Sequence, residues 1–161
     1  MTIRLFRAAR PFVLAPLAAA AMAGLILMVG ASAARAADME VEISGVTTTG
    51  AGTGAQVLVA AFTGGEGWLR QPVAVGRAAL SSAKAGVVTV RLTGLPDATV
   101  GLSVFQDQNG NGKLDRNAMG MPVEPYAFSR QAQGNFGPPS FEQAALPAGT
   151  ARHAIQLPAQ N

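Results

Sequence analysis

The stretch MEVEISGV, residues 39–46, alternates apolar and polar side chains. Successive side chains of a strand point to opposite faces of a sheet, so Met39, Val41 and Ile43 share one face. The two glutamates between them share the other face. This pattern is typical of a strand that is buried on one side and exposed on the other. We therefore expect a sheet with one face in a core.

Further segments of the chain read as strands of the same kind. Residues 88–95 alternate again, whereas residues 57–62 are apolar on both faces and suggest a central strand. Glycine-rich turns separate these segments, as in GAGTG at 50–54. Short strands joined in this way predict an all-β fold, an antiparallel β-sandwich of transthyretin-like or immunoglobulin-like type. The other expected strands cover residues 73–75, 100–105 and 151–157.

The first 36 residues have the three parts of a secretory signal. Arg4, Arg7 and Arg10 precede an uncharged apolar run at 11–30, and the small-residue triplets ASA and ARA end the segment at Ala36. We expect cleavage after Ala36, which makes residues 37–161 a single periplasmic or secreted domain with no stable membrane span. The alternative is an uncleaved anchor, since 20 uncharged residues are long enough to span a bilayer.

The basic character of the chain belongs to this N-terminal segment. The whole sequence has 12 basic and 9 acidic residues, and the first 36 residues hold four of the basic ones and none of the acidic ones. The remainder therefore carries a net charge of −1, which argues against a nucleic-acid partner. The sequence contains no cysteine. The fold must therefore rest on a packed core, without disulfides or a lipid-modified cysteine.

The loop DQNGNGKLD, residues 107–115, follows directly on the strand predicted at 100–105. It matches the first nine positions of an EF-hand-type calcium loop, in which oxygen ligands converge where a glycine turns the chain. The expected calcium ligands are the side chains of Asp107, Asn109, Asn111 and Asp115 and the backbone carbonyl of Lys113.

The loop also departs from that pattern. Position 12 should be a bidentate glutamate, and here it is Ala118. We therefore expect a weak site, with a Kd of about 10⁻⁴–10⁻³ M, to which Glu124 could add a ligand. The alternative is a metal-free turn, because Asn and Asp side chains bond their own backbone and glycine accepts positive φ.

Residues 119–145 combine aromatic residues with four prolines. Such a segment does not form a regular strand, and long ordered loops are often functional. One interpretation is a surface that binds a ligand or partner through Glu124, Tyr126, Phe128 and Arg130. The alternative is that the aromatic side chains fold back and cover the open end of the sandwich.

Several motifs in this half of the chain carry a family resemblance. The strand and the NGNGKLD loop are followed by GxPxExYxFS at 120–129 and FGPPSFExA at 136–144. This order resembles the exported bacterial family called domain of unknown function 2141, over nearly all of the chain after residue 36. The resemblance implies a secreted or periplasmic β-sandwich. It implies no reaction, because the family lacks an assigned activity.

Enzymatic motifs are scarce. The sequence has one histidine, His153, and no cysteine, so a multi-histidine zinc site and a cysteine nucleophile are excluded. We expect the side chain of His153 to be exposed. We predict a non-enzymatic module that binds an envelope protein or a small ligand. The alternative is a metal-assisted hydrolase that uses the acidic residues Asp107, Asp115 and Glu124.

Overall fold

A computed structural model describes residues 37–159, so the predicted signal at 1–36 lies outside the described part. Strands dominate, and the all-β prediction is confirmed. No helix of residues 37–159 is long and apolar enough to cross a membrane. The elements are β1 (Ala37–Ser44), β2 (Gln56–Phe62), η1 (Gly65–Gly67), β3 (Ala74–Ala79), η2 (Leu80–Ser82), β4 (Val87–Leu95), β5 (Val100–Asp107), β6 (Tyr126–Phe128), η3 (Ser129–Gln131), α1 (Phe141–Ala144), β7 (Ala145–Leu146) and β8 (Arg152–Gln156).

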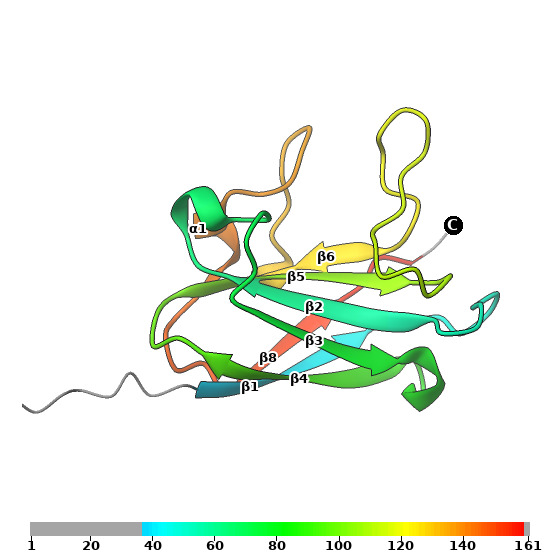
Figure 1. Ribbon diagram of the computed structural model, residues 1–161, viewed down its shortest axis with the longest axis horizontal. Coiled ribbons are helices and arrows are strands. Elements are labelled where there is room, and N and C mark those ends of the chain that lie inside the picture. The colour runs from blue at the N-terminus through cyan, green and yellow to red at the C-terminus, as the bar shows by residue number, and fades with distance from the viewer. Residues whose placement is uncertain (1–36, 160–161) are drawn as a thin grey trace, which may run out of the picture. The chain divides into compact units, whose positions relative to one another are not determined.

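The strands form two sheets (Figure 1). One sheet has the order β4-β1-β8, and the other has the order β3-β2-β5-β6, with β7 also pairing with β5. The pairs are antiparallel except for β1 and β8, which run parallel with Val41 opposite His153. The chain passes from β7 in one sheet to β8 in the other. No hairpin joins β8 to β1, so the connection does not require these two strands to be antiparallel.

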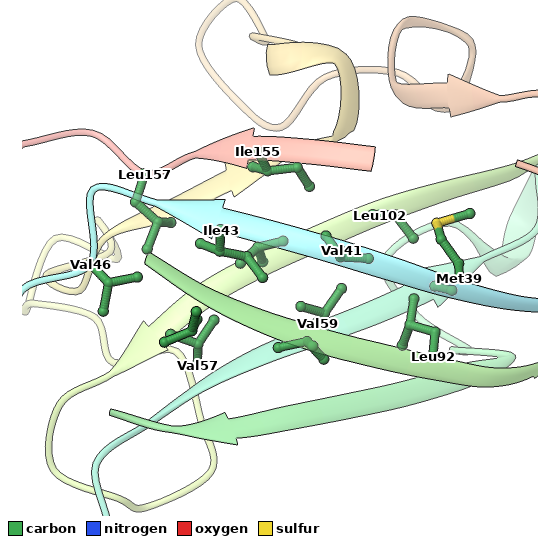
Figure 2. Packing of buried hydrophobic residues seen from close by; sticks show 14 of the residues in the cluster. Met39, Val41, Ile43, Val46, Val57, Val59, Leu92, Leu102, Ile155 and Leu157 are labelled. Carbon is green, nitrogen blue, oxygen red and sulfur yellow. The ribbon is translucent and has the colours of Figure 1, made fainter. Parts of the chain in front are cut away.

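The core lies between the two sheets (Figure 2). Met39, Val41 and Ile43 are almost wholly buried, as their alternation predicts. They pack in one cluster with side chains of the second sheet, including Val59 and Leu102. Full burial of an aliphatic side chain of this size contributes about 1.5–3 kcal/mol, so this cluster is the main source of stability.

The five-stranded sheet is also covered on its outer face, away from the core. Trp68 lies 5.5 Å from Phe62, 5.9 Å from Phe128 and 5.7 Å from Phe141, measured between ring centroids. Gly101 of β5 leaves room for the indole, since a Cβ there would be 2.7 Å from the ring. Aromatic side chains do fold back, therefore, but they cover a sheet face rather than the end of the sandwich.

Candidate functional site

Asp107 is the last residue of β5, and its carboxylate is fully buried at the base of the predicted calcium loop. Its Oδ1 accepts the backbone N–H groups of Gly110 at 2.8 Å and Asn111 at 3.1 Å. Its Oδ2 accepts the N–H of Gly112 at 2.8 Å and the side-chain amide of Gln56 at 3.0 Å. A carboxylate offers about four acceptor positions, so these four donors use all of them.

These hydrogen bonds also set the charge of Asp107. Burial raises the pKa of the carboxyl group, but the hydrogen bonds from Gln56 and the three backbone N–H groups lower it by more. The net pKa lies below its usual value of 3.8. Asp107 is therefore an ionised group at neutral pH, and its charge is satisfied by N–H donors.

Asn109, Asn111 and Asp115 come together at the other side of the loop. The Nδ2 of Asn109 donates to Asp115 at 2.6 Å, and the Nδ2 of Asn111 donates to both carboxylate oxygens of Asp115 at 3.0 Å. The Oδ1 of Asn111 accepts the backbone N–H of Lys113 at 2.8 Å. The sequence therefore places three of the predicted ligand side chains together, with the amide nitrogens turned toward the carboxylate.

The amide groups of this loop have the orientation of a metal-free state. Calcium requires oxygen ligands, whereas the amide groups present N–H to Asp115 and the oxygens of Asp107 face N–H donors. To hold calcium, both amides would have to turn so that Oδ1 replaces Nδ2. Within residues 37–159, no group of three or more Asp, Glu, His or Cys side chains has an arrangement that could hold a metal ion.

Glu124 acts on this loop from outside it. Its side chain is buried, Oε1 accepts the backbone N–H of Gln108 at 2.8 Å, and Oε2 accepts that of Asp115 at 3.0 Å. The residue was predicted to contact a ligand or to complete a calcium sphere. The structure instead places its carboxylate on the backbone at the two ends of the loop, where it fixes their separation.

Tyr126 and Phe128 lie beside a groove of about 490 Å³. The groove follows β6 and is also lined by residues 131–134, 137, 139 and 156–159, all of them uncharged at neutral pH. β6 is an edge strand, and no other strand of the described residues pairs with its second side. Of the four predicted ligand contacts, these two share a site, whereas Glu124 and Arg130 do not line it.

Arg130 and His153 form a separate contact near this groove. Arg130 has a positive φ of 60°, and its backbone N–H donates to His153 Nε2 at 3.0 Å. The guanidinium is exposed and donates to the carbonyl of Ala145 at 3.4 Å. The expectation that His153 is exposed is wrong, since the ring is half-buried and burial lowers its pKa below 6.5.

Two glutamines that the sequence pattern did not identify form hydrogen bonds with backbone groups, as a neighbouring strand would. The side-chain amide of Gln106 accepts the N–H of Thr47 at 3.1 Å and donates to its carbonyl at 2.6 Å. Gln131 does the same to Gln156, at 3.1 and 3.0 Å. Gln106 was detectable, because it is a polar residue at a core-facing position of the alternating β5 pattern. Gln131 lies in an irregular segment that gives no such signal.

Comparison with known proteins adds a family and no chemistry. A family model described as an uncharacterized protein conserved in bacteria (DUF2141) matches residues 41–156. This range runs from β1 to the end of β8 and includes the Asp107 loop and the groove residues up to Gln156, whereas residues 157–159 of the groove lie beyond it. No curated protein and no solved structure matches the chain.

Proposed function

The chain belongs to the DUF2141 family of uncharacterized bacterial proteins, and we propose that it is an exported, non-enzymatic binding module. It holds an extended segment of an envelope protein in the groove beside β6. Export is supported by the sequence pattern of residues 1–36, with its basic start, apolar run and small-residue end.

The observation that carries this proposal is the position of the groove along the free side of an edge strand. An edge strand offers backbone N–H and C=O groups to an added strand, and a neighbouring hollow accepts alternate side chains of the peptide. The uncharged lining favours a peptide segment with apolar and amide side chains. Tyr126 is partly exposed at this site and supplies an aromatic contact.

The hydrolase alternative receives less support from the same geometry. The oxygens of Asp107 and Glu124 already accept N–H donors, so neither carboxylate faces a substrate. Ser129 follows β6 and is fully buried, and its hydroxyl accepts the N–H of Leu102 and donates to the carbonyl of Ala144. His153 Nε2 accepts a backbone N–H. These groups are therefore engaged in holding the fold.

We also propose that the loop of residues 107–115 binds calcium weakly and that the ion has a structural role. The support for this is the sequence pattern and the convergence of Asn109, Asn111 and Asp115. A bound cation would replace the amide N–H groups around Asp115 and tighten a loop that Glu124 already holds.

A peptide selection tests the groove. Random peptides displayed on phage are selected on a chain that begins at Ala37, and the selected peptides are measured against two variants. Ala132→Arg fills the groove, and Ala148→Arg places the same side chain on an exposed turn elsewhere. We expect the peptides to bind Ala132→Arg at least about tenfold more weakly, to bind Ala148→Arg normally, and to slow hydrogen exchange in β6. Failure to select peptides, or equal binding to Ala132→Arg, would overturn the proposal.

A further inference from the structure

Exposed apolar side chains are concentrated on two loops of this domain. The described residues have seven exposed large hydrophobic side chains. Four of them, Met119, Met121, Val123 and Phe136, lie on these loops, and a fifth, Tyr126, lies on β6 between the loops. The other two, Val73 and Val75, lie at the β3 edge of the five-stranded sheet. The two loops, residues 108–125 and 132–140, both project beyond β6, at the opposite edge (Figure 1). An apolar concentration of this kind marks an interaction surface.

The first loop ends in an ordered hairpin. Arg116 pairs with Pro122 in an isolated bridge, and the side-chain oxygen of Asn117 accepts the N–H groups of Met119 and Met121, each at 3.0 Å. The two methionines are nevertheless 86% and 60% exposed. The backbone that carries them is therefore held in place while their side chains extend into solvent.

The second loop presents Phe136, whose side chain is fully exposed. Its φ of 59° is left-handed, a conformation that is rare for a bulky residue. The turn around it is tight, because a Cβ on Gly134 would overlap the backbone of Gly137. The carbonyl of Pro139 accepts the indole N–H of Trp68 at 2.9 Å, which fixes the base of the turn to the sheet. Strain and exposure at one aromatic residue point to a function at that position.

The charges beside these tips are mainly positive. Lys113 and Arg116 are exposed, whereas Asp115 is half-buried and Glu124 is buried against backbone N–H groups. The rest of residues 37–159 has more acidic than basic side chains. A surface that is cationic and apolar at its tips is complementary to anionic lipid headgroups above an acyl layer.

We propose that the two loops dock the domain onto the surface of an anionic lipid bilayer. Phe136, Met119 and Met121 enter the headgroup region, and Lys113 and Arg116 contact the lipid phosphates. A protein interface of ordinary stability needs a continuous area of about 800 Å² on each partner, whereas two projecting tips suit a layer that deforms around them. This docking uses the loop tips and does not depend on peptide binding in the groove.

Vesicle sedimentation tests the proposal with a chain that begins at Ala37, a position within the compact unit 33–161. The apolar run at 11–30 is left out because it would bind lipid by itself. Vesicles containing phosphatidylglycerol are compared with vesicles of phosphatidylcholine alone. We expect binding to the anionic vesicles, weakened by salt, with Phe136→Ser and Met119→Ser together reducing the affinity at least about tenfold. Lys113→Gln and Arg116→Gln should each reduce it about fivefold.

Val75→Ser is the matched control, because it removes an exposed apolar side chain from the opposite edge of the same sheet. It should leave vesicle binding unchanged, and thermal melts should show every variant folded. Three results would overturn the proposal: no sedimentation with either vesicle, an equal loss with Val75→Ser, or sedimentation of the protein without vesicles. The last of these would assign the tips to self-association.

Discussion

Glu124 accepts the backbone N–H of Asp115 at 3.0 Å across nine positions of sequence. Its other carboxylate oxygen accepts the N–H of Gln108 at 2.8 Å. One buried side chain therefore ties the first part of the Asp-rich loop to its last part. This contact gives the loop a defined width with or without a cation, and it places Glu124 among the residues that hold the structure.

Replacing this carboxylate should destabilise the domain. Glu124→Gln keeps the shape of the side chain but turns an NH₂ group toward one of the two backbone N–H donors. A buried donor left without an acceptor costs about 1–3 kcal/mol, and we expect a loss of that size in denaturant unfolding. Glu66→Gln changes an exposed glutamate and is the control. Equal stability of the two variants would contradict the role assigned to Glu124.

Calcium should raise the melting temperature if the loop binds it. A ligand that binds only the folded state at ten times its Kd stabilises by about 1.4 kcal/mol. We expect a higher melting temperature in millimolar calcium than in chelator, and Asp115→Asn should remove the difference, because Asp115 supplies the carboxylate nearest both amides. Asp97→Asn, at an exposed turn, should keep it. Identical melting of the unmodified chain in calcium and chelator would leave the loop metal-free.

Stability should decrease as the pH falls below 6.5. Burial lowers the pKa of His153 below 6.5, and its neutral Nε2 accepts the N–H of Arg130. The unfolded chain therefore takes up a proton at a higher pH than the folded chain does, so the contribution of His153 is complete above 6.5 and decreases below it. His153→Gln keeps an acceptor but does not titrate. Its free energy of unfolding should vary less between about pH 8 and about pH 5 than that of the unmodified chain.

The sequence predicted the parts of the fold that repeat with period two. The alternation in residues 39–46 identified β1 and its buried face, and the apolar run at 57–62 identified β2 as a strand buried on both sides. Neither pattern says which strand lies beside which. The parallel pairing of β1 with β8 depends on a crossover between sheets, and β6 and β7 have three and two residues, too few to show a period.

The sequence predicted where the candidate site lies but not which hydrogen bonds its side chains make. The spacing of Asp107, Asn109, Asn111 and Asp115 did bring these residues into one loop. The direction of each amide depends on which backbone N–H groups lie nearby, and spacing alone does not show this. Phe136 was expected within an aromatic segment, but its exposure follows from a tight turn that local composition does not reveal.

Gln106 provides a test of whether a side-chain amide satisfies backbone groups that have no neighbouring strand. It is fully buried, and its two hydrogen bonds satisfy both backbone groups of Thr47, which lies beyond the end of β1. Gln106→Leu fits a similar volume but leaves an N–H and a C=O without partners. We expect a loss of about 2–4 kcal/mol in the free energy of unfolding and faster hydrogen exchange at Thr47. The exposed change Gln71→Leu should have little effect. If Gln106→Leu is as stable as Gln71→Leu, other groups must satisfy the backbone of Thr47.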